Sequence, residues 1–369
     1  MNLAPLLPAG IAATVTFALV PDVIRFSEHE NLLDRPGPLK IHTRPVSRLG
    51  GVAIFFAVTA SLFLAVSELR NVRILSFFMA LTVIFLTGLL DDLRGLPPAP
   101  RLIAQFFAGA ILWLGGWRAP LFGSPAVDLL ATCFVLTLFV HALNFLDGSD
   151  GLAAGFAGIL AVGFASAPSA ALASPFAHTL AWALFGVCAA FLAYNLPSKL
   201  HLGDAGSNVI GFSLGFLAIE CINTRPLGDS RDILFPFVAA AVPILDLLAA
   251  IIRRVRAGRS PLSGDRNHLY DALLTRGWTP RGVACAYCAA AAVSVLLARS
   301  ILQTPRTVTY TLAAVFAAAL VYLYACVGCL EMKNGPEEIP AAAEYEENLV
   351  VQNVARKNAA HHGATSPGD

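Results

Sequence analysis

The chain has 369 residues, of which 57% are hydrophobic and only 13% are charged, with a net charge of +1 and a mean hydropathy of +0.69. This composition excludes an ordinary soluble globular domain and indicates an integral membrane protein. Because no cluster of basic residues is interleaved with aromatic residues, we expect no nucleic-acid partner.

About eleven apolar runs follow one another along the chain, each close to the roughly 20 residues with which a helix crosses a bilayer. We expect spans near residues 3–24, 49–67, 74–90, 102–117, 126–146, 152–173, 176–194, 208–223, 233–252, 282–298 and 307–328. A helix satisfies its own backbone in lipid, so the predicted fold is an all-α, polytopic transmembrane bundle over residues 1–330. The composition of residues 331–369 predicts an acidic, disordered cytoplasmic tail.

The basic residues predict how this bundle is oriented. With the loops between spans numbered in order, the odd-numbered loops and the C-terminal tail hold 18 of the 25 Lys and Arg residues, and the even-numbered loops hold 7. By the positive-inside bias, the odd loops are cytoplasmic and the N-terminus is outside. We therefore expect a multi-pass protein of the cytoplasmic (inner) membrane.

Five unusually polar stretches all fall in odd-numbered loops. They are "DRPGPLKIHTRPVSRLGG" in the first loop, "DDLRGLPPAPR" in the third, "NFLDGSDG" in the fifth, "NLPSKLHLGDAGS" in the seventh and "RRVRAGRSPLSGDRNHLYD" in the ninth. Ordinary connecting loops would not segregate so completely to one side. We expect the five loops to converge on a single cytoplasmic site.

In the third loop, Asp91 and Asp92 end a long apolar run. Successive residues are about 100° apart around a helix, so the two carboxylates are expected to have separate tasks. A carboxylate at a helix C-terminus opposes the macrodipole, and two of them at a membrane boundary are unfavourable without a cation or a buried role. The alternative is a solvated helix end.

In the fifth loop, Asp147 and Asp150 are each followed by a glycine, which predicts a tight loop with both carboxylates directed at a ligand. The alternative is a turn in which Asp150 caps the next helix. Asn144 precedes this loop on the last turn of its span, where helix packing is the alternative role.

In the seventh loop, Asp204 lies between Gly203 and Gly206, and Ser207 is expected to open the next helix. A helix N-terminus offers N–H groups to an anion, but a carboxylate there repels phosphate unless a divalent cation lies between them. Asp and Asn oxygens suit Mg²⁺. The alternative is a capped helix start with an Asx turn.

The ninth loop is the most basic. A positive-inside anchor accounts for Arg253, Arg254 and Arg256, whereas Arg266 and His268 suit a structured anion-binding segment. Carboxylates, a hard cation and basic residues at one membrane face together favour phosphoryl transfer.

Five motifs in order, "LKIHTRPVSRLGG", "GLLDDLRGL", "NFLDGSDGLAAG", "LHLGDAGS" and "GRSPLSGDRNHL", resemble those of the polyprenyl-phosphate N-acetylhexosamine-1-phosphate transferases, glycosyltransferase family 4. The resemblance runs from about Asp34 to Gly277. It implies that a lipid phosphate attacks the β-phosphorus of a UDP-sugar and releases UMP, with Mg²⁺, or alternatively Mn²⁺, as the cofactor.

The first and ninth loops look more like the UDP-GlcNAc branch than the phospho-MurNAc-pentapeptide translocase branch. We therefore expect UDP-GlcNAc or a similar UDP-N-acetylhexosamine and undecaprenyl phosphate as substrates, membrane lipid as a partner, and an early step of a cell-envelope glycan such as lipopolysaccharide. A homodimer is an alternative to a monomer.

The resemblance also assigns roles by motif. It implies Asp204 as the principal metal ligand with Asn144 as a second, and Asp91 and Asp92 as the catalytic acidic pair that deprotonates the lipid phosphate or organises the metal. The implied substrate contacts are Lys40, His42, Arg101, Asp147, Asp150, Asn195, Lys199, Ser207, Arg266 and His268.

Two departures from the family pattern bear on these roles. Tyr270 and Asp271 stand where several relatives have further histidines, so a mechanism that needs a histidine cluster is not expected. His141 stands where many members have Asn.

Two other classes of protein also combine many spans with a few acidic residues. A secondary transporter has its site near the bilayer midplane on broken helices, often within inverted repeats, whereas the acids here lie at one face. A CDP-alcohol-type phosphotransferase would have its aspartates in one compact helical segment.

Overall fold

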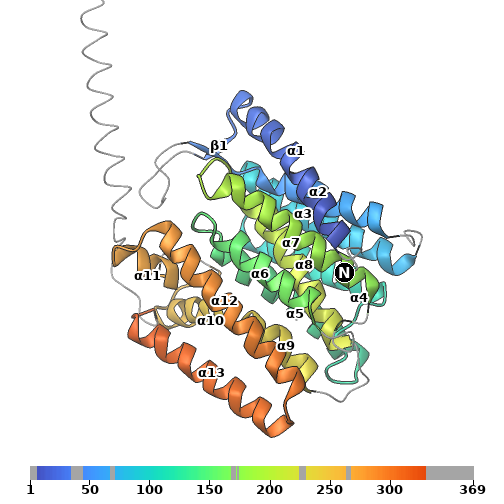
Figure 1. Cartoon of the computed structure of the whole chain (residues 1–369), viewed down its shortest axis with the longest axis vertical. Helices are drawn as coiled ribbons and strands as arrows, with labels where there is room; N and C mark the ends of the chain where they lie inside the picture. The colour runs from blue at the N-terminus through green and yellow to red at the C-terminus, as the bar shows by residue number, and fades with distance from the viewer. Residues whose placement is uncertain are drawn as a thin grey trace, which may run out of the picture.

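The computed structural model describes residues 6–34, 45–66, 71–167, 172, 174–223, 230–262 and 267–329. In these ranges the chain forms a bundle of helices with one small two-stranded sheet (Figure 1). The elements are α1 (Leu7–His29), β1 (Leu33–Asp34), β2 (Val46–Ser47), α2 (Gly50–Ala65), α3 (Val72–Arg94), α4 (Pro98–Leu114), α5 (Pro125–Leu146), α6 (Leu152–Ala165), α7 (Pro175–Asn195), α8 (Gly203–Asn223), α9 (Ser230–Ala239), α10 (Ala241–Arg256), α11 (Leu269–Thr275), α12 (Pro280–Gln303) and α13 (Arg306–Cys326).

The helices confirm a polytopic helical membrane protein. Among the described residues, seven helices are long and apolar enough to cross a membrane, namely α1, α3, α5, α7, α8, α12 and α13. The pair α9 and α10 would make an eighth span, and α2, α4 and α6 are shorter apolar helices. Each of the eleven predicted runs coincides with a helix or with the bent pair, but helix length assigns only seven or eight spans, so the count of eleven is not confirmed.

The run predicted as one span at 233–252 is broken. α9 and α10 meet at an angle of 73°, with Ala240 between them. Pro243 accounts for the break, because a helix continued through Ala240 would bring its ring against the carbonyl of Ala239. Beyond the bend, α10 packs against α5.

Helix α8 lies at the centre of the bundle, with its whole apolar stretch buried among α2, α3, α5 and α7 (Figure 1). Small residues allow this close packing. A Cβ atom on Gly88 of α3 would lie 2.6 Å from the Cα of Ala205, and one on Gly211 would lie 2.7 Å from the Cα of Val140 on α5. The first turn of α8 is therefore in backbone contact with its neighbours.

The sheet connects the first loop to the start of α8. β1 pairs antiparallel with β2, and Ser47 of β2 forms a parallel bridge to Leu200. Just beyond β2, the N–H of Gly51 donates to the carbonyl of Leu202 at 2.9 Å. Two segments that lie about 150 residues apart in the chain therefore run side by side, immediately before Asp204.

Candidate active site

The two carboxylates that end α3 have different partners. Asp91 is only 8% exposed, and its oxygens accept hydrogen bonds from the guanidinium of Arg101 and from the backbone N–H of Leu96, both at 2.6 Å. Asp92 faces α8 instead, where it accepts from backbone N–H groups. The separation of partners follows from the 100° between neighbours on a helix.

Asp92 caps α8 from another helix. Its two carboxylate oxygens accept from the N–H groups of Asp204 and Ala205 at 2.8 and 2.9 Å. Gly203 makes room for this contact, because its φ is +68° and a Cβ there would lie 2.7 Å from the Asp92 carboxylate. Two expectations are corrected. α8 begins at Gly203 and not at Ser207. The N–H groups of Asp204 and Ala205 donate to the Asp92 carboxylate and are therefore not free for a ligand.

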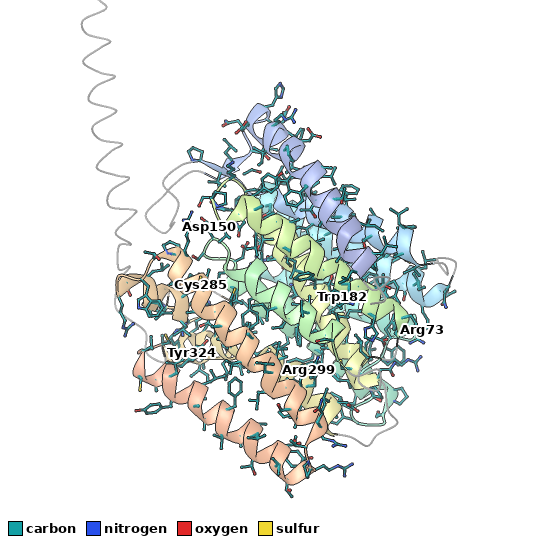
Figure 2. All side chains as sticks on the ribbon, viewed as in Figure 1. Arg73, Asp150, Trp182, Cys285, Arg299 and Tyr324 are labelled. Carbon is teal, nitrogen blue, oxygen red and sulfur yellow. The ribbon has the colours of Figure 1, made fainter. Side chains whose placement is uncertain are left out.

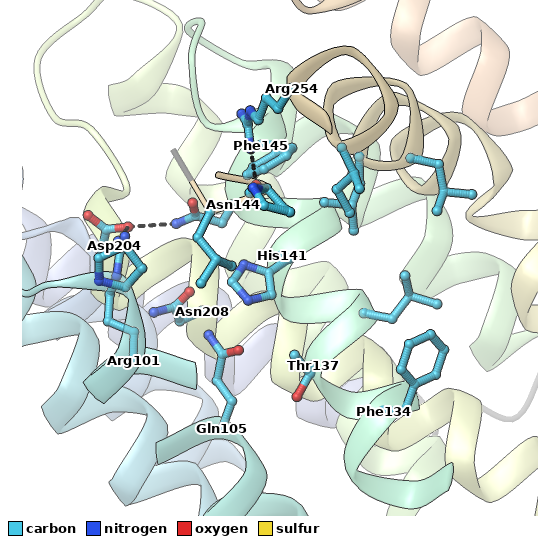
Figure 3. A pocket seen from close by; sticks show the side chains of 17 residues that line it. Arg101, Gln105, Phe134, Thr137, His141, Asn144, Phe145, Asp204, Asn208 and Arg254 are labelled. Carbon is cyan, nitrogen blue, oxygen red and sulfur yellow. Dashed lines mark hydrogen bonds and ion pairs between the residues drawn. The ribbon is translucent and has the colours of Figure 1, made fainter. Parts of the chain in front are cut away.

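Asp204 lies between an amide and a guanidinium (Figure 3). Asn144 on α5 donates from Nδ2 to Oδ1 of Asp204 at 2.6 Å and to the hydroxyl of Ser207 at 3.0 Å. A guanidinium nitrogen of Arg101 lies 3.8 Å from the same Asp204 oxygen. Ser207 is fully buried in α8, and its hydroxyl donates to the carbonyl of Gly203. The same hydroxyl accepts from Asn144 and so helps to position the amide of that residue.

Carboxylates from several loops influence one another here. Burial, together with the carboxylates of Asp204 and Asp92, raises the pKa of Asp147 well above its usual range. Burial by itself would lower the pKa of the Arg48 guanidinium, but nearby carboxylates, including Asp92 and Asp204, raise it above its ordinary value. The site therefore combines a surplus of negative charge with two arginines, Arg48 just after β2 and Arg101 on α4.

The fifth and seventh loops are joined by side-chain contacts. Asp150 accepts a hydrogen bond from the hydroxyl of Ser198 and lies 3.4 Å from Nε2 of His201. Asn195 accepts from the N–H of Gly151 at 2.7 Å and donates to the Leu200 carbonyl. Asp150 does not cap α6, whose N-cap is Gly151. In Figure 2, Asp150 lies at the end of the bundle opposite Arg73.

The ninth loop is held by a buried carboxylate. Asp246 of α10 is fully buried, and its oxygens contact Nδ1 of His268 at 2.7 Å and the N–H of Leu269 at 3.1 Å. The His268 ring stacks on Tyr270 with a 5.6 Å centroid separation and a 1° interplanar angle. The Tyr270 hydroxyl reaches the place that a side chain on Gly148 would fill. Tyr270 thus links the ninth loop to the fifth.

A cavity of about 370 Å³ opens beside Asp204 and Asn144 (Figure 3). On one side of the cavity, the lining residues are polar and lie three or four positions apart on each of three helices. They are Arg101 and Gln105 on α4, Asn144, His141 and Thr137 on α5, and Asp204 and Asn208 on α8. The opposite part of the lining is mainly apolar and includes Phe134, Leu138, Phe145, Leu247, Leu248, Ile251 and Leu262, but the guanidinium-bearing Arg254 of α10 also lines the cavity. Polar and apolar surfaces meet at the carboxylate end.

Some predicted site residues are not brought into this arrangement. Lys40, His42 and Arg266 lie outside the described residues. Lys199 is exposed, and its N–H bonds to the Tyr194 carbonyl. Both ends of the Asn195 amide are bonded to backbone groups, so its role as a substrate contact stays a prediction.

Sequence reasoning overlooked Arg48, His201 and Asp246. Asp246 carried a usable signal, because an ionisable residue in the middle of the run "VPILDLLAAII" is costly in a membrane without a partner. Arg48 and His201 stood inside motifs that were noticed for other residues. Their positions depend on the pairing of the first and seventh loops, which has no local signal.

Comparison with known proteins gives consistent matches. The model of glycosyl transferase family 4 matches residues 74–222. Decaprenyl-phosphate N-acetylglucosaminephosphotransferase of Mycobacterium tuberculosis is 31% identical in an alignment of 310 residues, which covers 74% of this chain and 76% of that protein. The protein of the same name from Mycolicibacterium smegmatis is 32% identical over 67% of this chain and 69% of its own. Undecaprenyl-phosphate alpha-N-acetylglucosaminyl 1-phosphate transferase of Escherichia coli is 26% identical over 68% of this chain and 71% of its own.

Proposed function

Because the chain belongs to glycosyl transferase family 4, we propose that it transfers a sugar 1-phosphate from a UDP-sugar to a polyprenyl phosphate and releases UMP. The sugar is N-acetylglucosamine or a similar N-acetylhexosamine, as in the names of the relatives. The observation that carries this proposal is the meeting of Asp92, Asn144, Arg101 and Asp204 at the polar end of a cavity with an apolar wall.

The cavity supports a lipid acceptor. Its apolar wall on α5 and α10 suits a prenyl chain, and its polar end presents Arg101 to a phosphate. Phe134, on the lining, is 60% exposed on a helix long and apolar enough to cross a membrane, so the cavity reaches a lipid-facing surface. The acceptor can then keep its chain in lipid while its phosphate reaches Asp204.

The side chains at the polar end fit Mg²⁺. Within the described ranges, no group of three or more His, Cys, Asp or Glu side chains is arranged to hold a metal. Mg²⁺, however, usually takes one or two protein carboxylates and completes its shell with water and substrate phosphates. Asp204 and Asn144 would hold it, with the amide of Asn144 turned so that its oxygen faces the ion. When bound, the ion neutralises phosphate charge.

The chain's own residues supply positioning and charge. A phosphate monoester has a second pKa of about 6 and is largely dianionic at neutral pH, so the acceptor needs little help from a base. Arg101 would hold its oxygens, and Asp91 holds Arg101. Because both oxygens of Asp91 already accept hydrogen bonds, positioning is the role that this geometry favours. The acceptor oxygen then attacks the β-phosphorus in line, and UMP leaves.

The proposal places the site at the cytoplasmic face of the inner membrane, with the N-terminus outside. Its support is the unequal distribution of Lys and Arg between odd and even loops. UDP-sugars are cytoplasmic nucleotides, so the donor would reach the site from that face. Cysteine labelling at exposed Lys199 and at exposed Arg118 should report opposite compartments.

A transfer assay tests the function directly. Membranes that contain the protein are incubated with undecaprenyl phosphate, Mg²⁺ and one radiolabelled UDP-sugar at a time, with and without EDTA. We expect labelled lipid and released UMP, both lost with EDTA and with Asp204→Ala but retained with Asp22→Ala, which changes an exposed carboxylate on α1. Label that enters sealed vesicles without forming lipid product would instead indicate a transporter, an alternative that the comparisons do not support.

A further inference from the structure

Arg48 has a fixed backbone position beside the first turn of α8. The residue before it, Ser47, accepts a hydrogen bond from the N–H of His201 at 2.9 Å, and its hydroxyl bonds to that of Ser27 at 2.6 Å. The carbonyl of Arg48 itself reaches the place that a side chain on Gly203 would fill. The guanidinium is therefore attached to a backbone that the seventh loop holds in place.

Carboxylates from four separate segments of the chain attract the Arg48 guanidinium. It lies 3.8 Å from the Asp34 carboxylate, and Asp92, Asp204 and Asp147 also attract it electrostatically. The Asp34 pair is long compared with the 2.7–2.9 Å or so of a strong charge-assisted hydrogen bond, and the Arg48 side chain is 44% exposed. An incoming anion can therefore reach this guanidinium and exchange with its carboxylate neighbour.

Arg48 and Arg101 both act electrostatically on Asp204, and they come from different elements. Arg101 comes from α4 and lines the cavity, together with the apolar residues of α5 and α10. Arg48 comes from the first loop, beside β2, and is absent from that lining. An apolar acceptor suits the cavity that Arg101 lines. The exposed guanidinium of Arg48 is then left for a water-soluble substrate.

We propose that Arg48 binds the diphosphate of the nucleotide-sugar donor, while Arg101 serves the phosphate of the acceptor. This inference rests on the proposed function. The planar guanidinium of arginine matches phosphate oxygens in pairs, which a lysine ammonium does not reproduce. Separate cations for the two substrates also reduce their mutual repulsion as they approach Asp204.

Steady-state kinetics of the full-length protein in detergent micelles test the proposal, with UDP-GlcNAc and undecaprenyl phosphate varied in turn. We expect Arg48→Gln to raise the KM for UDP-GlcNAc about 10- to 100-fold, the usual effect of losing hydrogen bonds to a charged group, with the KM for undecaprenyl phosphate changed less than about twofold. Arg48→Lys should recover part of the loss. Arg101→Lys should show the opposite pattern.

Arg94→Gln is the matched control, because Arg94 is an exposed arginine at the same end of α3 as the site. Neither KM should change in this variant. Titration of UDP-GlcNAc by calorimetry, without acceptor, provides a second readout and should show the same loss of affinity for Arg48→Gln.

Three outcomes overturn the inference. If the wild-type protein transfers sugar phosphate but Arg48→Gln leaves the donor KM and the donor affinity unchanged, Arg48 does not bind the donor. If both KM values rise together and the melting temperature falls, Arg48 only balances the charge of the carboxylates. If the wild-type protein neither binds nor transfers any UDP-sugar, the proposed function itself fails.

Discussion

Asp92 accepts a hydrogen bond from the backbone N–H of Asp204 at 2.8 Å, although the two residues lie 112 positions apart in the chain. One carboxylate of the α3 pair thereby caps the helix whose first turn carries the proposed metal ligand. The negative charge of Asp92 complements the positive end of the α8 dipole, which resolves the unfavourable placement of a carboxylate at the end of α3.

Asp92→Ala should destabilise the protein through loss of this cap. Two N–H groups of α8 would lose their acceptor, and the expected cost is about 0.5–2 kcal/mol, as for other helix caps. Asp92→Asn keeps one acceptor oxygen and should fall between alanine and the wild type. Thermal denaturation in detergent, followed by tryptophan fluorescence, measures this order. Equal melting temperatures for all three proteins would show that the cap contributes nothing.

Asp91 and Arg101 should act as one unit. We expect Asp91→Ala and Arg101→Ala each to reduce kcat/KM, and the double variant to be little worse than either, with a coupling of about 0.5–3 kcal/mol. The reason is that Asp91 contacts Arg101 at 2.6 Å and acts through it. The double-mutant cycle is measured with the transfer assay. Additive losses would instead favour an independent role for Asp91, such as the proton acceptor implied by the family resemblance.

Asp246 should orient His268. Asp246→Asn leaves a side chain of similar size but a weaker acceptor for Nδ1 of His268, so we expect kcat to fall about 10- to 100-fold, as when other carboxylates that orient a histidine are removed. Combining it with His268→Gln should add little further loss. The kinetics are compared with the melting temperature of each variant. Unchanged kcat in Asp246→Asn would count against the substrate contact that the family resemblance implies for His268.

The raised pKa of Asp147 predicts that the stability of the metal-free protein depends on pH. Its pKa in the folded state is raised by burial and neighbouring carboxylates, whereas an aspartate in the unfolded chain has a pKa of about 3.9. Between those two values the folded protein holds a proton that the unfolded chain has lost, so stability decreases as the pH rises through this window. Asp147→Asn removes the free-energy cost of ionising this buried carboxyl group. In EDTA, the melting temperature of the Asp147→Asn variant should exceed that of the wild type at pH 8, and the difference should shrink toward pH 4.

The exposed carboxylate of Asp22 provides the comparison for this experiment. Asp22→Asn should follow the wild-type melting temperature at both ends of the range. If the melting temperature of Asp147→Asn also equals that of the wild type throughout the pH range, ionisation of Asp147 does not destabilise the folded protein. If it is less stable than the wild type at pH 8, its carboxylate has a favourable partner there.

The sequence determined that this protein is a helical bundle in a membrane and that its polar stretches share one side, because hydropathy and the balance of basic residues are local properties of each segment. It also pointed to Asp204 and Asn144, which the structure places 2.6 Å apart. It could not show that Asp92 caps α8, that Asp246 holds His268, or that Arg48 lies beside Gly203. These contacts depend on tertiary structure, and the two at the start of α8 depend on backbones that approach closely at Gly88 and Gly203. The packing of α2 and α3 against α8 decides which carboxylate meets the first turn of α8.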